Sequence, residues 1–425
     1  KGGVANMALS GPVIVVADEA AQVHEALAAG GNLPVRAASA DDAAALIAET
    51  EPSAVVLAER AADPDHHQAQ AIADAVDRCG GSIIPIMAIV HDSPVYPLAL
   101  PVQAEDIPTR LVGRLRSALR VRALHASVLR RIEQLGEDDT VPESAEYDPI
   151  EDATVLVAGR GRGYPALTVA VGERMGLIGA LSIETARSYL GARDIDGVVI
   201  GDGFNRSMVE DFMEELGADP RWRDLPVIVP REAAHTIDSE RMPNVDQMTG
   251  TPEQIAAHML PFARMHAFAS RLKRMALALD QKGAVAPETG LMTAVAFMAE
   301  LQRAAASAES RGAGLSLARL SFDILPNRRA SLDAARITGR LLRPSDIACR
   351  DEDGSILIGF TETDLVTAHV VARRIASVLK HTTLALGSER TRLGPTVALA
   401  AFRARDTVES LVARTCDSPA RFQQA

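Results

Sequence analysis

The sequence predicts an α/β protein with two doubly wound (βα)5 units in tandem, followed by an α+β unit. Three observations predict this fold class. Two successive series of short apolar runs alternate with helical stretches. Such alternation is typical of parallel sheets covered by helices. An acidic stretch without hydrophobic periodicity, residues 136–152, separates the two series and reads as a linker. After residue 286 the rhythm changes, and the dipeptide Asp353-Gly354 between two short strands predicts an antiparallel hairpin.

The first unit covers residues 11–135. Four short apolar runs read as buried strands, and the patterns between and after them indicate helices, the last of which is long and rich in Arg and Leu. The predicted strands are Val13–Val16, Val35–Ala38, Ala54–Leu57 and Ile83–Val90, and the predicted helices cover residues 20–28, 41–47 and 107–135.

The second unit, residues 153–279, repeats this rhythm, which makes an internal duplication plausible. A long helix begins near Pro252, because proline is favoured in the first helical turn. The other predicted elements are the strands Thr154–Ala158, Gly197–Ile200 and Pro226–Val229 and the helices Pro165–Met175 and Asn205–Leu216.

The third unit, residues 286–425, is the predicted α+β unit with antiparallel pairing. The predicted strands are Leu315–Phe322, Ile347–Arg350, Ser355–Phe360 and Pro395–Phe402, and the predicted helices cover residues 293–309, 332–342, 365–380 and 407–414.

Composition narrows the classes of partner. The net charge of −12 argues against a broad electrostatic footprint on a nucleic-acid polymer or an anionic membrane. No run of about 18 apolar residues is present, so we expect no membrane insertion. The three cysteines lie far apart, which suits a reducing cytoplasm and gives no zinc-binding spacing. We therefore expect a cytoplasmic protein without a metal site.

Three segments of the third unit carry a recognisable pattern. Pro287–Leu291 precedes its first helix, Arg343–Asp346 has the spacing R-x-x-D shortly before the hairpin, and Ser355–Phe360 follows the hairpin turn. In this combination the third unit resembles a GGDEF (diguanylate cyclase) domain, and the first two units resemble the receiver domains of response regulators. The resemblance covers the whole chain and implies a role in cyclic di-GMP signalling.

The signature of an active cyclase is degenerate in this chain. In the family, two glycines let the backbone approach the GTP phosphates, and the adjacent carboxylates hold Mg²⁺. Here acidic residues replace both glycines, and the loop after Asp323 that would read guanine is short. We therefore predict no enzymatic activity and no catalytic residues. The matching hairpin positions are Glu352, Asp353, Gly354, Ser355 and Ile356.

The receiver-like units lack the residues for phosphotransfer. That chemistry uses an acidic pocket, an acceptor Asp and a Lys that pairs with the phosphoryl group, yet no lysine occurs between residues 2 and 272. The phosphoacceptor positions fall on Ala58 in the first unit and Gly201 in the second. In the first unit, Asp18 and Glu19 could remain from the acidic pocket. Asp202, one position after Gly201, is a weak candidate acceptor. We expect these units to dimerise and to dock protein partners.

The resemblance implies that Arg343 and Asp346 bind cyclic di-GMP, together with Arg374 and its neighbour Arg373. The chemistry suits these residue types, because arginine offers a two-pronged donor to guanine O6/N7 or phosphate, and a carboxylate accepts guanine N–H groups. Two structural alternatives stay open. Arg343 and Asp346 could pair with each other or cap a helix end, and Arg374 could be solvated or pair with Glu362 or Asp364.

A glycine-rich stretch after the first strand of the second unit, Gly159–Gly163, contains Arg160 and Arg162. It lacks the G-x-G-x-x-G motif of a dinucleotide-binding loop, so nucleotide binding at this loop is a minor alternative. Its two arginines are candidates for secondary contacts to cyclic di-GMP.

The leading hypothesis is a non-catalytic cyclic di-GMP receptor that requires no cofactor and recruits protein partners. The order of units resembles cell-cycle response regulators of alphaproteobacteria. That resemblance implies polar localisation, a homodimer formed through the receiver-like units, and delivery of a target to the ClpXP protease through an adaptor. The alternatives are a ligand-independent scaffold, a residual diguanylate cyclase, and signalling gated by phosphorylation.

Overall fold

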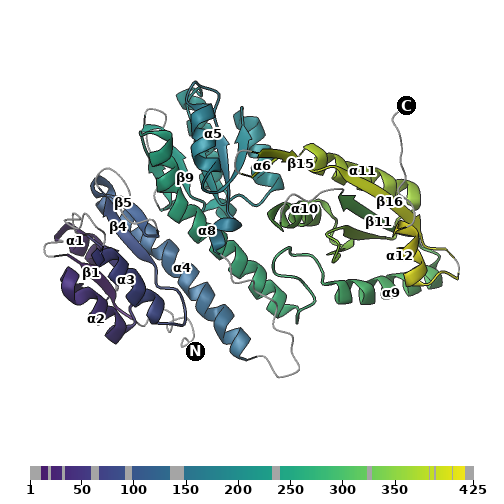
Figure 1. The fold of residues 1–425 in the computed structure, drawn as a ribbon, viewed down its shortest axis with the longest axis horizontal. Helices are drawn as coiled ribbons and strands as arrows, with labels where there is room; N and C mark the ends of the chain where they lie inside the picture. Colours follow the sequence, from purple (N-terminus) through teal and green to yellow (C-terminus); the bar gives the residue numbers. More distant parts are fainter. Residues whose placement is uncertain are drawn as a thin grey trace. The chain divides into compact units, whose positions relative to one another are not determined.

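The computed structural model describes residues 11–17, 21–30, 34–58, 67–90, 98–134, 148–231, 240–322, 328–381, 383–386, 389–403 and 405–416. The chain forms two compact units (Figure 1). Unit 1 comprises Lys1–Gln134, Asp148–Arg187 and Ile195–Leu272, and unit 2 comprises Leu135–Tyr147, Ser188–Asp194 and Lys273–Ala425.

The first half of unit 1 is a parallel five-stranded sheet with the strand order β2-β1-β3-β4-β5, a doubly wound order. Alternate residues of β1 face opposite sides: Val13 and Val15 pack with α1 and α4, whereas Ile14 and Val16 pack with α2 and α3. The elements are β1 (Val13–Val16), α1 (Ala21–Ala29), β2 (Val35–Ala38), α2 (Ala40–Thr50), β3 (Ala54–Leu57), α3 (His67–Arg78), β4 (Ile86–Val90), β5 (Leu100–Gln103) and α4 (Ile107–Glu133).

The second half of unit 1 repeats this topology, because its five parallel strands pair in the order β7-β6-β8-β9-β10. Helices α5 and α8 supply the apolar residues that cover one face of this sheet. The elements are β6 (Thr154–Ala158), α5 (Tyr164–Gly172), β7 (Gly176–Ala180), α6 (Ile183–Ala192), β8 (Gly197–Ile200), α7 (Arg206–Ala218), β9 (Val227–Val229), β10 (Val245–Gln247) and α8 (Pro252–Asp280). Both halves are therefore doubly wound as predicted, and their likeness to receiver domains remains a prediction.

A buried charged cluster joins the two halves of unit 1. Arg114 on α4 is fully buried, and its Nη2 lies 2.7 Å from Oδ1 of Asp246 on β10. The other carboxylate oxygen of Asp246 lies 2.7 Å from Nε2 of His258, and the Arg114 guanidinium stacks over the Phe262 ring. Burial opposes ionisation of Asp246, but Arg114 and His258 outweigh burial and hold its pKa far below the usual range.

Unit 2 contains a four-stranded antiparallel sheet with the order β12-β13-β11-β16. Helices α10 and α11 pack on one face of this sheet, and α9 and α12 pack on the other. The elements are α9 (Ala294–Arg311), β11 (Leu315–Phe322), α10 (Arg328–Leu341), β12 (Ile347–Arg350), β13 (Ile356–Thr361), α11 (Leu365–His381), β14 (Thr383–Leu386), β15 (Glu389–Arg392), β16 (Pro395–Ala401) and α12 (Val408–Cys416).

Several boundaries differ from the sequence prediction. The predicted strand Ile83–Val90 begins only at Ile86, because Pro85 has no N–H to give to a sheet. The sequence analysis also missed α3, β5, β7, α6, β10 and the β14–β15 hairpin. The missed strands are only three to five residues long, so tertiary packing determines them, whereas α3 was missed because its sequence is mostly polar. No helix among the described residues combines the length and the apolar character needed to cross a bilayer.

Candidate functional site

Residues 352–355 form the turn between β12 and β13, as the Asp-Gly dipeptide predicted. The Asp351 N–H donates to Ser355 O at 2.8 Å, and the Gly354 N–H donates to Asp351 O at 3.0 Å. Gly354 has a φ of +82°, a conformation that glycine adopts without strain. The Asp353 carboxylate accepts the Ser355 N–H at 2.8 Å, so a signature residue is used to close the turn.

Arg319 on the central strand β11 binds the two carboxylates of this turn. Its Nη2 pairs with Asp351, and its Nη1 lies 3.3 Å from Asp353 Oδ2. Burial alone lowers the pKa of the Arg319 guanidinium, but the Asp351 hydrogen bond and the charge of Asp353 raise it above its ordinary value. Burial likewise raises the pKa of Asp353, whereas bonds from Ser355 and the charge of Arg319 lower it overall. The negative charges of Asp351 and Asp353 are therefore neutralised by Arg319, a residue of the same chain.

This arrangement does not fit a magnesium–nucleotide site. Mg²⁺ requires carboxylate oxygens that are free to coordinate it, whereas here Arg319 binds one oxygen of Asp351 and one of Asp353, and backbone N–H groups bind the other two. The remaining candidate ligand, Asp323, lies outside the described residues. Nor do three His, Cys, Asp or Glu side chains gather into a metal-binding group anywhere in the described ranges.

The R-x-x-D segment forms a tight turn after α10. The backbone N–H of Arg343 donates to Asp346 Oδ2 at 3.1 Å, and the Asp346 N–H donates to Arg343 O at 3.0 Å. The two residues therefore do pair with each other after the end of α10, through the Arg343 backbone and not through an ion pair of their side chains. The exposed Arg343 guanidinium has no partner among the described residues, and neither has Asp346 Oδ1. The Arg343 guanidinium, as a donor, and Asp346 Oδ1, as an acceptor, therefore remain available to a ligand.

Arg373 and Arg374 lie on the exposed side of α11. The buried stripe of this helix is formed by Ala368, Ala372, Ile375 and Leu379. At 100° per residue the two arginines flank this stripe on opposite sides, so they cannot both face the neighbouring helix α10.

No acidic residue that the structure describes pairs with Arg374. Asp364, one of its proposed acidic partners, instead caps α11 by accepting the Thr367 N–H at 2.9 Å. The other one, Glu362, has no contact to Arg374. Arg374 is therefore available to a ligand, as Arg343 is.

Asp202 and the glycine-rich loop of unit 1 bind each other. The N–H groups of Arg160 and Gly161 donate to Asp202 O at 3.1 Å, and the Gly163 N–H donates to Asp202 Oδ2 at 3.2 Å. A Cβ on Gly161 would lie 2.2 Å from the Asp202 carboxylate. The chain's own carboxylate thus fills the space that an anion would need at the start of α5.

The two arginines of this loop differ in availability. Arg160 Nε donates to Gly203 O at 2.8 Å, and its guanidinium lies 5.5 Å from the Phe204 ring centre. Arg162 is exposed, and the structure gives its guanidinium no partner within the described parts of the chain. Of the two predicted secondary contacts, only Arg162 is free in this conformation.

The remaining receiver-like positions offer little chemistry. Ala58 and Gly201 follow β3 and β8, as the sequence predicted, and neither can accept a phosphoryl group. Asp18 and Glu19 lie outside the described residues.

Sequence reasoning missed Arg319 and Arg114, the two arginines with the most extensive buried partnerships. A signal for Arg319 was present, because a single charged residue interrupts an otherwise apolar strand. For Arg114 the signal was helical spacing, because Arg110, Arg114 and Ser117 share one face of α4 that is distinct from the face of the buried leucines.

No protein-family model and no curated protein matches the chain. Solved structures similar to it are GGDEF-domain proteins. The diguanylate cyclase SiaD of Pseudomonas aeruginosa, in complex with its activator SiaC, is 21% identical over 34% of this chain, with a TM-score of 0.31. The match spans 60% of the SiaD chain.

Two further similar structures come from Caulobacter crescentus. A sensory box/GGDEF family protein is 15% identical over 32% of this chain and 96% of its own, with a TM-score of 0.30. The coiled-coil and GGDEF domain of DgcB, in complex with c-di-GMP, is 20% identical over 36% of this chain and 90% of its own, with a TM-score of 0.31. At these identities and TM-scores the likeness concerns the fold alone.

Proposed function

We propose that unit 2 is a GGDEF-type domain that binds cyclic di-GMP and has no cyclase activity. The observation that carries the proposal is a contrast between two sets of arginines. Arg319 neutralises the signature carboxylates inside the domain, whereas the guanidinium groups of Arg343, Arg373 and Arg374 are exposed and have no partner among the described residues.

The ligand has the chemistry that these side chains would recognise. Its phosphates and its guanine O6/N7 edges accept bonds from arginine, and its guanine N–H groups suit the free oxygen of Asp346. Arg343 follows α10, and α10 packs with α11 on one face of the sheet, so both arginine segments belong to the same side of unit 2.

Isothermal titration calorimetry with cyclic di-GMP tests the proposal on the full chain. We expect the wild type to bind and Arg343→Ala to weaken binding by about 1.5–3 kcal/mol, roughly tenfold to 150-fold in Kd. Arg374→Ala and Arg373→Ala, made separately, identify which side of α11 contributes. Arg311→Ala is the matched control, because Arg311 is exposed at the end of α9 on the opposite face.

The absence of heat with the wild-type protein would contradict the receptor and favour the ligand-independent scaffold. Incubation with GTP and Mg²⁺, followed by chromatography, tests the enzyme alternative, and we expect no cyclic di-GMP to form. Radiolabel transfer from a kinase that Asp202→Asn abolishes would revive phosphorylation gating.

The proposed cellular role rests on the resemblance of the chain to PleD and, in the degeneracy of its third unit, to PopA. It comprises cytoplasmic and polar localisation, homodimer formation through the receiver-like units, and recruitment of an adaptor of the ClpXP pathway. Within unit 1, the β5–α4 face of the first half already packs against β10 and α8 of the second. We therefore propose that a homodimer uses other surfaces of these halves, which analytical ultracentrifugation with surface variants tests.

A further inference from the structure

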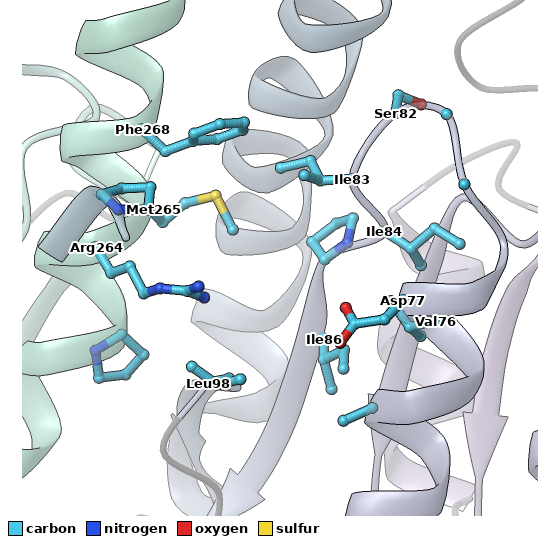
Figure 2. Close-up of a pocket in the computed structure, with 16 residues that line it drawn as sticks. Val76, Asp77, Ser82, Ile83, Ile84, Ile86, Leu98, Arg264, Met265 and Phe268 are labelled. Carbon is cyan, nitrogen blue, oxygen red and sulfur yellow. The ribbon is translucent and has the colours of Figure 1, made fainter. Parts of the chain in front are cut away.

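A cavity of about 340 Å³ lies between the two halves of unit 1 (Figure 2). One wall comes from α3 and the segment that follows it, and the opposite wall comes from α8. Aliphatic and aromatic side chains dominate the lining, among them Ile84, Leu98, Met265 and Phe268. This volume and lining are typical of small-molecule sites.

Helix α4 holds both walls in place. Arg122 on α4 donates to Ile83 O at 2.9 Å, and the Ile83 N–H donates to Nδ1 of His125 at 3.1 Å. The His125 ring also meets the Phe268 ring edge to face, with the ring centres 5.1 Å apart. The same helix therefore fixes one wall by hydrogen bonds and the other by an aromatic contact, so the cavity is formed before any ligand arrives.

Two charged side chains reach into the cavity from opposite walls, Arg264 from α8 and Asp77 from α3 (Figure 2). Arg264 is already paired, because its Nε donates to Asp148 Oδ1 at 2.8 Å. The exposed carboxylate of Asp77 has no partner among the residues that the structure describes. The cavity thus combines an apolar lining with two charged side chains, of which only Asp77 lacks an ion-pair partner among the described residues.

We propose that this cavity binds a small organic cation with an apolar body, such as a protonated aryl-alkyl amine. The ammonium group pairs with Asp77, and the apolar body lies between Ile84 on one wall and Met265 and Phe268 on the other. Such a ligand contacts both halves of unit 1 and shares no residue with the proposed cyclic di-GMP site in unit 2.

Methyl NMR of the full chain with ¹³C-labelled methionine tests the proposal, because the Met265 thioether points into the cavity (Figure 2). The probes are phenethylamine, 2-phenylethanol and 3-phenylpropionate, which are matched in their apolar body and carry positive, zero and negative charge. Met265→Leu assigns the signal. We expect phenethylamine to shift it at about fivefold lower concentration than either other probe, the size of one partly exposed charge pair.

Asp77→Asn is expected to remove this preference for the amine. The matched control is Asp74→Asn one turn earlier on α3, where the carboxylate pairs with Gln70 and does not line the cavity. Ala73→Phe, which fills the cavity from α3, is expected to abolish the shift for all three probes. If that variant does not fold, Asp77→Asn still decides the question.

Three results would overturn the proposal. They are an unmoved Met265 signal with phenethylamine, an equal preference for the amine in Asp77→Asn, and a lower effective concentration for 3-phenylpropionate than for phenethylamine.

Discussion

Arginine plays opposite roles at different positions of this chain, and burial explains the difference. Arg319 is 9% exposed and Arg114 is fully buried, so each would be costly to bury without a carboxylate partner. Both have one, Asp351 and Asp246 respectively. Arg343 stays in water and needs no internal partner, which leaves its guanidinium available for a ligand.

His125 gives a pH dependence to the stability of unit 1. Burial and the nearby Arg122 lower the pKa of His125 below its ordinary value of 6.5, and its Nδ1 must stay unprotonated to accept the Ile83 N–H. As the pH falls through about 6.5, the unfolded chain takes up this proton more readily than the folded chain. We therefore expect the free energy of unfolding to decline below pH 6.5, until the folded-state pKa is passed.

Urea unfolding followed by the fluorescence of Trp222, the single tryptophan and a residue of unit 1, measures this effect. His125→Gln keeps an acceptor for the Ile83 N–H but does not titrate, so its stability should change less between pH 7.5 and 5.5. Equal pH dependence in both proteins would show that other groups cause it.

At the level of elements, the loop between β6 and α5 packs closely against the loop between β8 and α7, and glycines allow this close approach. Gly203 has a φ of +96°, and a Cβ there would lie 2.7 Å from the Gly161 backbone nitrogen. Gly203→Ala therefore adds both backbone strain and a clash with a neighbouring main chain. We expect it to destabilise unit 1 by at least about 1 kcal/mol in the same fluorescence assay.

Gly172→Ala is the control, because it lies at the end of α5 and its Cβ would make only ordinary contacts with Leu177. Alanine favours the helix, so this change should be neutral or stabilising by up to about 1 kcal/mol. A Gly203→Ala protein as stable as the wild type would mean that the loop can rearrange at little cost.

For the molecule as a whole, Arg114 makes the two sheets of unit 1 depend on each other. Arg114→Met leaves Asp246 buried with only His258 as a polar partner, so we expect a loss of about 3–5 kcal/mol in the unfolding free energy. Trp222 fluorescence during urea unfolding measures the loss.

Arg116→Met, which removes one exposed hydrogen bond from α4 to Gly30 O, should cost less, at most about 1.5 kcal/mol. The double variant Arg114→Met/Asp246→Asn should lose less than the sum of the two single variants, because the unpaired charge is gone. Strict additivity would contradict a direct interaction between the two side chains.

Particular elements show how far the sequence could predict the fold. Buried strands such as Val13–Val16 and Ala54–Leu57 were located to the residue, because a continuous apolar run has few other solutions. Helix α3 was missed although it is amphipathic, because Ile72 and Val76 are its only apolar side chains larger than alanine. For the candidate site, the R-x-x-D segment and the altered hairpin could be read from their spacing, whereas the role of Arg319 could not.

The sequence by itself determined the alternation of strands and helices, the antiparallel hairpin, the R-x-x-D spacing and the scarcity of lysine. These features are local in the chain, so periodicity and motif spacing express them directly. Only the tertiary structure decided that Arg319 neutralises Asp351 and Asp353, that Asp202 fills its own loop, and that an apolar cavity with a free carboxylate lies between the halves of unit 1. Such contacts join residues far apart in the chain, and burial decides whether a charge must find a partner there.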